Sequence, residues 1–281
     1  MVETVTLFDG HTMPAIGLGV SLNDECAEAC RVALQNGYRM IDGARHYENE
    51  VQVGVGVGKS GVKREDVFIT SKVFHTDYTY DGATAALKDS IANLGSCKSY
   101  LPNNVLAYYD LYLTHSATGG KDARLAAYRA LLDGKASGMI KSVGVSNYSA
   151  KHIEEIREAG LEIPVVNQIE LHPFCQQKAI VEYCRKNNIV VQAYSPLVRG
   201  ALDNRVIQEL STKYSKDPAQ ILVRWSLQRG FVPLPKSSQP ERIISNGQVF
   251  GWEIEPTDMA KLDALDRGKE GAITWNPVEV D

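Results

Sequence analysis

The sequence lacks the cysteine pattern of a disulfide-stabilised protein. Its five cysteines are odd in number, and no two of them are separated by two residues. Free thiols in such an arrangement are typical of proteins kept in a reducing compartment. Cys26 and Cys30 lie four residues apart in a stretch with helical periodicity, so we expect them to be packing residues.

The sequence also lacks a long apolar run and a strong excess of either charge. No run approaches the roughly 18 residues of a membrane span, and the N-terminal MVETVTLFDG has no basic segment followed by an apolar core. The formal net charge is −4 and the charges are interspersed. We therefore expect a cytoplasmic protein whose partners include neither nucleic acid nor a membrane.

The length and composition fit one globular unit. The chain has 281 residues, of which 44% are hydrophobic and 23% charged, as is ordinary for a soluble protein with a substantial core. No linker or low-complexity segment divides it. We therefore predict a single domain spanning residues 1–281.

Short apolar runs alternate with amphipathic stretches along most of the chain. A hairpin is predicted within residues 4–16, around Asp9-Gly10. Eight strands are predicted at 15–20, 38–43, 67–73, 110–115, 142–147, 164–171, 189–196 and 231–236. Helices are predicted at 24–37, 80–94, 121–137, 149–159, 176–187, 203–214, 217–229 and 257–266. Apolar runs of this kind suit parallel strands buried on both faces. The pattern predicts an α/β fold, a (β/α)₈ TIM barrel with an N-terminal β-hairpin. The barrel is favoured over the alternative of a doubly wound sheet, which needs fewer strands and usually a second domain.

Polar residues collect at the carboxyl ends of these predicted strands. Asp42, Lys72 and His115 end three successive apolar runs, and Tyr47 follows the first of them by five residues. Further polar pairs end the last four strands: Ser146-Asn147, Asn167-Gln168, Tyr194-Ser195 and Lys236-Ser237. Catalytic residues of a TIM barrel lie at the carboxyl ends of its strands, so one face of the fold is predicted to be a reaction site.

A glycine-rich segment imitates a nucleotide-binding motif. Residues 56–61 match GxGxxG, but the dinucleotide fingerprint requires a strand before it and a helix after it. Here the polar YENE precedes it and a new strand follows within about six residues. A P-loop is also excluded, because its first glycine would fall at Val53. We interpret the segment as a poorly helical connection after the second strand.

Histidines near the strand ends raise the possibility of a metal-dependent barrel hydrolase. His46, His75 and His115 are the candidates. The sequence has no HxH pair and no evident carboxylate to complete a facial or binuclear site, so we predict no bound metal.

The side chains of Asp42, Tyr47, Lys72 and His115 make chemical sense together. A phenol has a pKa near 10 and is a poor acid at neutral pH. A neighbouring ammonium favours the phenolate and lowers that pKa, and a carboxylate behind the lysine keeps it charged. Such a phenol can protonate a developing alkoxide while a histidine donates a hydrogen bond to the same oxygen. This combination suits carbonyl reduction if a hydride donor binds alongside, although scattered polar residues at strand ends would give the same spacing.

The whole chain resembles an aldo-keto reductase, and in particular the fungal and microbial members of that family. Eight motifs carry the resemblance in order: GLG at 17–19, IDxAxxYxNE at 41–50, FITSK at 68–72, DLYLTH at 110–115, GVSN at 144–147, NQIELHP at 167–173, AYSPL at 193–197 and PKSSQPERIISN at 235–246. Their number and order make the resemblance far more specific than any one motif.

The resemblance implies an NADPH-dependent reductase with a catalytic tetrad. Tyr47 would donate the proton, Lys72 would lower its pKa, Asp42 would pair with the lysine, and His115 would orient the carbonyl. The resemblance also implies which residues bind NADPH or NADP⁺: Gly19, Val20, Asp42, Ser146, Asn147, Gln168, Tyr194, Ser195, Pro196, Leu197, Lys236, Ser237, Ser238, Arg242 and Asn246. Of these, Ser146, Asn147 and Gln168 would hold the carboxamide, and the nicotinamide ring would stack on Tyr194.

The residue types of the last motif, at 235–246, indicate a phosphate site independently of the resemblance. Lys236, Ser237 and Arg242 form a compact cluster of cations and a hydroxyl, which suits the 2′-phosphate of NADP because a guanidinium can bind two oxygens at once. An enzyme that prefers NAD would have little use for this cluster. We therefore expect NADPH over NADH.

Departures from the family pattern concern the substrate pocket. Val20-Ser21 follows GLG where an aromatic residue is frequent, Ser116 stands where tryptophan is common, and Gly43 stands where threonine is usual. The pocket is thus expected to lack two aromatic walls. The candidate substrate residues are Ser21, His46, Tyr47, Phe74, His115, Ser116 and Trp275, the last of which could instead pack at the barrel rim.

The family resemblance also allows a regulatory or structural subunit that binds nucleotide without turnover. The intact tetrad favours the enzyme, because a binding module needs no Tyr-Lys pair. Small aldehydes, α-keto esters or lactones, aromatic ketones and open-chain sugars all fit as substrates. No stretch demands a protein partner, so we expect a monomer or a weak oligomer.

Overall fold

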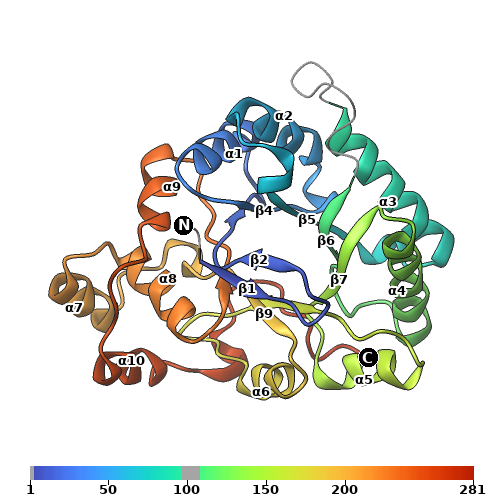
Figure 1. Cartoon of the computed structure of the whole chain (residues 1–281). Coiled ribbons are helices and arrows are strands. Elements are labelled where there is room, and N and C mark those ends of the chain that lie inside the picture. Colours follow the sequence, from blue (N-terminus) through green and yellow to red (C-terminus); the bar gives the residue numbers. More distant parts are fainter. Residues whose placement is uncertain (1–2, 97–107) are drawn as a thin grey trace.

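Eight parallel strands form the centre of the molecule, and the TIM barrel predicted from the sequence is confirmed (Figure 1). The computed structural model describes residues 3–96 and 108–281. The strands are β3 (Leu18–Gly19), β4 (Met40–Asp42), β5 (Phe68–Val73), β6 (Tyr109–Thr114), β7 (Ile140–Ser146), β8 (Val166–Glu170), β9 (Val190–Tyr194) and β10 (Val232–Pro233). Each pairs in parallel with the next. Backbone hydrogen bonds from Gly17 to Pro233 (3.1 Å) and from Gly19 to Pro235 (3.0 Å) join the first strand to the last and close the barrel.

The predicted N-terminal hairpin closes one end of this barrel (Figure 1). Its strands β1 (Thr4–Thr6) and β2 (Thr12–Pro14) pair antiparallel. Leu7 and Met13 are buried among apolar residues from the amino ends of the barrel strands, such as Met40 and Phe68. At the hairpin tip, Ser142 donates a hydrogen bond to Asp9 (2.7 Å). The hairpin therefore seals the amino end, and the carboxyl ends of the strands form the opposite, open face.

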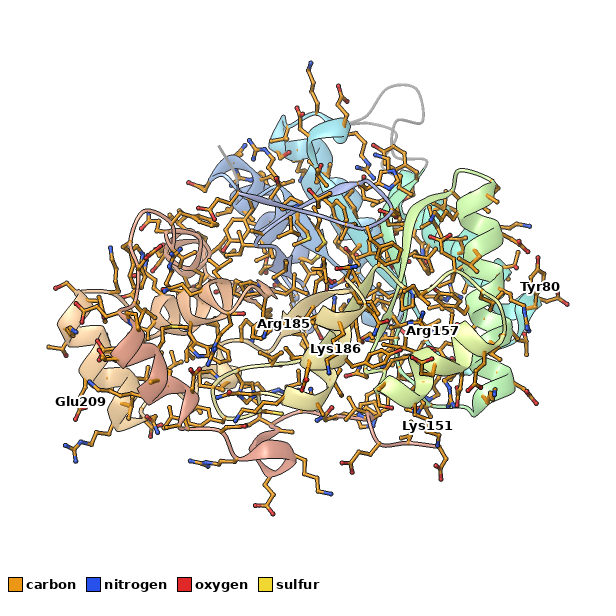
Figure 2. The ribbon with its side chains drawn as sticks, turned by 60° about the horizontal axis from the view of Figure 1, so that its bottom comes forward. Tyr80, Lys151, Arg157, Arg185, Lys186 and Glu209 are labelled. Carbon is orange, nitrogen blue, oxygen red and sulfur yellow. The ribbon has the colours of Figure 1, made fainter. Side chains whose placement is uncertain are left out.

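Helices surround the barrel. They are α1 (Cys26–Gln35), α2 (Glu50–Ser60), α3 (Tyr80–Gly95), α4 (Lys121–Ala136), α5 (Ala150–Glu158), α6 (Lys178–Lys186), α7 (Arg205–Tyr214), α8 (Pro218–Gln228), α9 (Pro240–Gly247) and α10 (Pro256–Asp263). Short 3₁₀ helices are η1 (Arg45–Tyr47), η2 (Arg64–Asp66), η3 (His75–Asp77), η4 (Val198–Gly200) and η5 (Gly268–Gly271). Exposed side chains such as Tyr80, Lys151 and Glu209 lie at the edges of the molecule in Figure 2. The apolar faces of the helices are buried against the strands, as their sequence periodicity predicts.

The glycine-rich segment after β4 is a helix, and the prediction of a poorly helical connection was wrong. Residues Glu50–Ser60 form α2, which packs against α1. A Cβ atom at Gly56 would lie 2.5 Å from Cys30 Cβ and 2.6 Å from the Ala27 carbonyl oxygen. The glycine lets two helix backbones approach closely, and the packing outweighs its poor helix propensity.

The short helix α9 was not predicted, because its PERIISNG sequence was read only as part of a binding motif. Four cysteines, Cys26, Cys30, Cys175 and Cys184, are buried free thiols, and Cys97 lies outside the described residues. In the two described segments of the chain, no helix combines the length and the apolar composition that crossing a membrane requires.

Gly56→Ala tests the close contact between α1 and α2. Helix propensity alone would favour alanine by about 1 kcal/mol, but the new methyl group overlaps α1, so we expect the free energy of unfolding to fall by about 1–3 kcal/mol. Urea denaturation measures it. Gln52→Ala, on the exposed face of α2, is the control and should change stability by less than about 0.5 kcal/mol. A stabilised Gly56→Ala protein would refute the contact.

Candidate functional site

The open face of the barrel brings together four residues that the sequence placed at strand ends. Asp42 ends β4, Lys72 lies near the end of β5, His115 follows β6, and Tyr47 lies on the 3₁₀ helix η1 after β4. Lys72 Nζ is 2.7 Å from Asp42 Oδ1 and 5.2 Å from the centre of the Tyr47 ring. The Tyr47 and His115 rings are 5.6 Å apart and meet edge to face. The predicted convergence of these side chains is thus observed.

Asp42 and Lys72 form a buried ion pair within this group. The Lys72 side chain is 0% exposed and donates to Asp42 Oδ1 and to the Gly43 carbonyl, both at 2.7 Å. The second carboxylate oxygen of Asp42 accepts from Gln168 Nε2 at 2.7 Å. Burial lowers the pKa of Lys72, but Asp42 and Tyr47 more than offset this effect, so the pKa lies above its ordinary value. Lys72 is therefore charged at neutral pH and fixed in direction.

The Tyr47 hydroxyl is kept protonated by its surroundings. Burial raises the pKa of Tyr47, and this effect outweighs the lowering by the Lys72 ammonium. Asp42 raises the pKa further, and the Ser21 hydroxyl lowers it. The sequence predicts that Lys72 dominates the pKa of Tyr47, and burial dominates instead. The phenol thus holds its proton until a reacting partner takes it.

His115 is a neutral imidazole with an unused nitrogen. Burial lowers the pKa of His115 well below its ordinary value, and the nearby Lys72, His46 and His75 lower it further. Its backbone is fixed by a bond from its amide to Val73 (2.9 Å) and by one from Asn147 Nδ2 to its carbonyl (3.1 Å). Its buried Nδ1 has no hydrogen-bond partner among the described residues. A buried polar atom of this kind is available to a ligand.

Aromatic and imidazole rings wall one side of the tetrad. His46 stacks on Phe74 with 3.9 Å between ring centres and 3° between planes. Phe74 lies 5.5 Å from His115 and 4.1 Å from His75, and His75 lies 6.0 Å from Trp275. The candidate substrate residues His46 and Phe74 therefore lie next to His115 of the tetrad, and Trp275 joins the same wall through His75. His75, a candidate metal ligand in the sequence, joins the same wall.

Two serines that replace aromatic residues of the family pattern have different surroundings. Ser21 lies close enough to Tyr47 for its hydroxyl to favour the phenolate. Ser116 is 0% exposed, and its Oγ accepts a hydrogen bond from the Thr118 amide (3.4 Å). The Tyr78 hydroxyl is bonded to the Ser116 backbone, with its oxygen 2.8 Å from the Ser116 carbonyl oxygen. The expectation that Ser116 lines the substrate pocket needs correction, because Ser116 is covered by its own neighbours.

A second group of predicted residues forms a connected network beside Asp42. Ser146 Oγ donates to the Gln168 carbonyl (2.8 Å), and Tyr194 donates to Asn147 Oδ1 (2.8 Å). Gln168 reaches Asp42 through its amide nitrogen, while its carbonyl Oε1 accepts no hydrogen bond from the described residues. Asn147 has a φ of +61°, a conformation that asparagine tolerates better than most residues. The network links the predicted cofactor residues to the tetrad.

The predicted cofactor residues that follow β9 lie on a loop at the same face. Ser195, Val198 and Arg199 all have φ between +44° and +51°, and such strained backbone is concentrated at functional sites. Pro196 is buried and Leu197 partly buried in that loop. Gly19 and Val20 are buried beneath the face, where the Val20 amide donates to the backbone carbonyl of Asp42 (3.1 Å).

The loop and helix after β10 hold the cationic cluster predicted from the sequence. Lys236 and Arg242 are exposed, and neither makes an ion pair with any described residue. Ser237 Oγ accepts from the Gln239 amide (3.0 Å), Ser238 is partly exposed, and Asn246 is buried on α9. Free exposed cations beside a hydroxyl are the donor set that a phosphate requires.

Sequence reasoning missed Asn23, which lies next to this cluster. Asn23 is buried, its Nδ2 donates to the Ser237 carbonyl (3.3 Å), and its Oδ1 has no partner among the described residues. Nothing in the local sequence marks it, because the contact joins positions 214 residues apart. In the described ranges, no group of three or more histidine, cysteine or acidic residues is placed to hold a metal ion.

Comparisons with known proteins agree on one family. A model of the Aldo/keto reductase family matches residues 15–267. The chain is 41% identical over 282 residues to Glyoxal reductase of Bacillus subtilis (strain 168), with 99% of this chain and 97% of that protein covered. The solved structure of MGS-M4, an aldo-keto reductase from a deep-sea metagenome library, is 36% identical with a TM-score of 0.91, covering 99% of this chain and 100% of its own. The structure of Bombyx mori aldo-keto reductase in complex with NADP is 31% identical with a TM-score of 0.85. The match covers 95% of this chain and 93% of that chain.

The neutral state of His115 predicts a pH dependence of stability. Because the folded-state pKa is depressed, the unfolded chain takes up a proton first as the pH falls below about 6.5, and the free energy of unfolding decreases from there downward. Urea denaturation at pH 7.5 and 5.5 should show a smaller loss for His115→Gln than for the wild type. NMR of labelled histidine, assigned by the resonance missing from that variant, should show a neutral ring at pH 6. A protonated ring there would contradict the prediction.

Proposed function

The chain belongs to the aldo/keto reductase family, and on that premise we propose that it reduces aldehydes or ketones to alcohols with NADPH, using Tyr47 as the proton donor. As a member of the family, it is an NADP-dependent oxidoreductase. The observation that carries the assignment of roles is the buried Lys72, whose ammonium is 2.7 Å from Asp42 and 5.2 Å from the Tyr47 ring. A lysine in this position has no structural need to face a phenol.

The proposed mechanism assigns one task to each residue of the tetrad. Reduced nicotinamide supplies a hydride to the carbonyl carbon when it is bound. The Tyr47 hydroxyl donates its proton to the carbonyl oxygen, which would otherwise carry the negative charge. The Lys72 ammonium stabilises the phenolate that remains, and Asp42 holds the ammonium in place. A nitrogen of neutral His115 can donate a second hydrogen bond to the same oxygen.

The raised pKa of Tyr47 is consistent with this role. Because burial disfavours the phenolate, the hydroxyl is fully protonated before the reaction. A carbonyl oxygen that gains negative charge beside Tyr47 is strongly basic, and the nearby Lys72 makes the phenolate attainable. Lys72 thus stabilises the phenolate that proton transfer leaves behind, more than it lowers the pKa of Tyr47 before the reaction.

The residues present fit the nicotinamide cofactor. Gln168 Oε1 is an open acceptor for a carboxamide, and Ser146 and Asn147 lie in the same network. The unpaired Lys236 and Arg242 suit a 2′-phosphate. The Bombyx mori relative was solved in complex with NADP, which supports the same choice here.

We propose short polar carbonyl compounds, such as 1,2-dicarbonyls, as the substrate class. The wall beside the tetrad contains the imidazoles of His46, His75 and His115 together with Phe74. Such a surface offers hydrogen bonds to a second oxygen as well as apolar contact. The relative from Bacillus subtilis is named Glyoxal reductase, which supports the same class.

Tyr47→Phe tests the proton donor. Because the hydroxyl is removed and the ring is kept, kcat for aldehyde reduction should fall by about 10²- to 10⁴-fold, while the Kd for NADPH stays nearly unchanged. NADPH oxidation followed by absorbance, and fluorescence titration of NADPH, measure the two. Tyr80→Phe, an exposed tyrosine on α3, is the control. Turnover retained in Tyr47→Phe would remove Tyr47 as the acid.

Arg242→Ala tests the phosphate cluster. Loss of a charge-assisted bond to the 2′-phosphate should weaken NADPH binding by about 10- to 100-fold, with little effect on NADH. Titration with both nucleotides measures the ratio of affinities. Arg205→Ala removes an exposed arginine on α7 that pairs with Glu209 and should change neither affinity. An equal loss for NADPH and NADH would contradict the role of Arg242.

A further inference from the structure

The last residues of the chain cross the open face of the barrel next to the tetrad. We call residues 271–281 the C-terminal strap. It begins at Gly271, where a Cβ atom would lie 1.7 Å from the Phe174 carbonyl oxygen, so only glycine fits there. It then contacts residues at the ends of β8 and β9, and Trp275 lies 6.0 Å from His75, which follows β5.

One buried carboxylate holds the start of the strap. Glu170 is 0% exposed and accepts hydrogen bonds from the amides of Ile273 (2.6 Å) and Thr274 (3.1 Å). The Thr274 hydroxyl donates to the same carboxylate, and His172 Nε2 lies 2.9 Å from it. A carboxylate has about four acceptor positions, so these contacts use the whole group. Three of the four come from the strap.

We propose that Glu170 is a positioning residue that fixes the C-terminal strap and thereby limits the size of the carbonyl compound admitted beside Tyr47. The limit on size rests on the proposed function, whereas the anchoring of the strap does not. In the described part of the chain the Glu170 carboxylate bonds to Ile273, Thr274 and His172, none of which belongs to the tetrad, so we infer that it acts through Trp275.

The strap meets the site at two points. The Trp275 ring lies beside His75, in the wall that includes Phe74 and reaches His115. The Trp275 carbonyl also accepts from the Tyr194 hydroxyl at 3.2 Å, while the same hydroxyl lies 2.8 Å from Asn147 Oδ1. A phenol has one proton to donate, so Trp275 and Asn147 share the bond from Tyr194. The position of the strap is thus coupled to the residues proposed to hold the nicotinamide.

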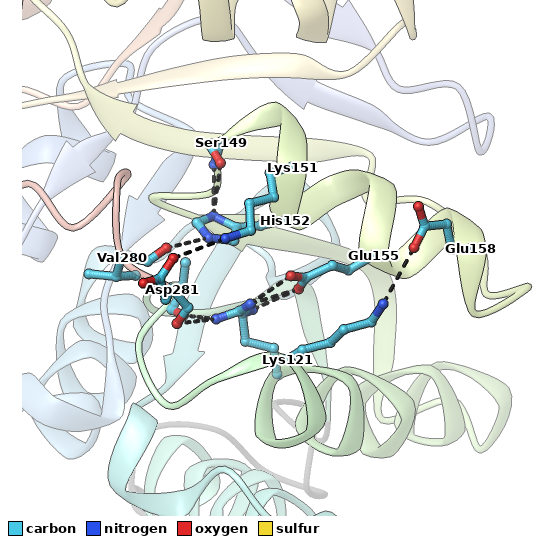
Figure 3. A network of polar contacts seen from close by, with 10 residues as sticks. Lys121, Ser149, Lys151, His152, Glu155, Glu158, Val280 and Asp281 are labelled. Carbon is cyan, nitrogen blue, oxygen red and sulfur yellow. Dashed lines mark hydrogen bonds and ion pairs between the residues drawn. The ribbon is translucent and has the colours of Figure 1, made fainter.

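The far end of the strap is tied independently, as Figure 3 shows. His152 Nε2 lies 2.8 Å from the Val280 carbonyl, and Lys151 pairs with Asp281 (3.1 Å). Arg124 donates to the Asp281 carbonyl (3.1 Å) while it pairs with the buried Glu155. These ties lie at least five residues beyond Trp275, whereas Glu170 holds the two residues immediately before it. Together with the Tyr194 hydroxyl, which bonds to the Trp275 carbonyl, Glu170 is therefore the anchor next to the Trp275 ring in the described part of the chain.

Hydrogen–deuterium exchange tests the anchor without any turnover. In Glu170→Gln one carboxylate oxygen becomes an NH₂ group that cannot accept a hydrogen bond, so at least one of the two strap amides loses its acceptor. The peptide covering residues 272–276 should then exchange about tenfold faster or more. Glu50→Gln is the matched control, because Glu50 is also buried and accepts from Ser71, Tyr109 and Asn93 without touching the strap. Unchanged exchange in Glu170→Gln would overturn the anchor. Thr274→Val, which alters only the strap, provides the same test if Glu170→Gln does not fold.

Steady-state kinetics with propanal and benzaldehyde test the effect on size. In Glu170→Gln or Thr274→Val the KM for benzaldehyde should fall about fivefold or more relative to that for propanal, while kcat for propanal stays within about twofold. Equal changes for both aldehydes, with faster exchange, would mean that the strap is anchored but does not select substrates. A wild-type protein that reduces neither aldehyde would overturn the proposed function and the size limit, and the exchange result would still decide the anchor.

Discussion

The buried ion pair between Asp42 and Lys72 is the interaction on which the arrangement of the open face depends. An ammonium that is 0% exposed requires a carboxylate and further acceptors, and these come from β4, its following loop and β8 through Asp42, Gly43 and Gln168. Loss of either charge would leave the other buried and uncompensated, which is among the most destabilising changes a protein interior can undergo. The pair therefore keeps three segments in register and, by doing so, fixes the direction of the charge that faces Tyr47.

Polar contacts extend from this pair across the face in a continuous series. Gln168 connects Asp42 to β8, the backbone carbonyl of Gln168 accepts from Ser146, and Asn147 connects that position to both His115 and Tyr194. The proposed proton donor and the proposed nicotinamide platform are thus parts of one hydrogen-bonded structure. Only a few buried polar atoms on this face, such as His115 Nδ1 and Asn23 Oδ1, lack partners in the described part of the chain. A preorganised network with a few open positions is what binding a cofactor and a carbonyl compound requires.

The places where the sequence misled are those where packing over long distances outweighs local preference. Glycines at 54, 56 and 58 indicate a weak helix, yet the contact of Gly56 with Cys30 and Ala27 stabilises α2. An ammonium beside a phenol suggests a lowered pKa for Tyr47, yet the depth of burial reverses the sign. Ser116 is a candidate substrate residue in the sequence, yet Tyr78 and other neighbouring residues cover it. In each case the deciding neighbour is distant in the sequence or is a property of the whole fold.

The sequence by itself determined the barrel, the open face and the tetrad. A chain in which apolar runs alternate with amphipathic stretches can fold compactly in only a few ways. A charged residue that ends a buried strand lies at the end of the barrel. The ordered motifs then located the residues proposed to bind the cofactor. Only the tertiary structure decided which side chains surround Trp275 and how Glu170 holds the strap. It also decided that the Tyr194 hydroxyl proton is shared between Asn147 and Trp275. The contacts from Tyr194 and Glu170 to the strap join residues about 80 to 100 positions apart, and their existence depends on burial and on loop paths that no local pattern encodes.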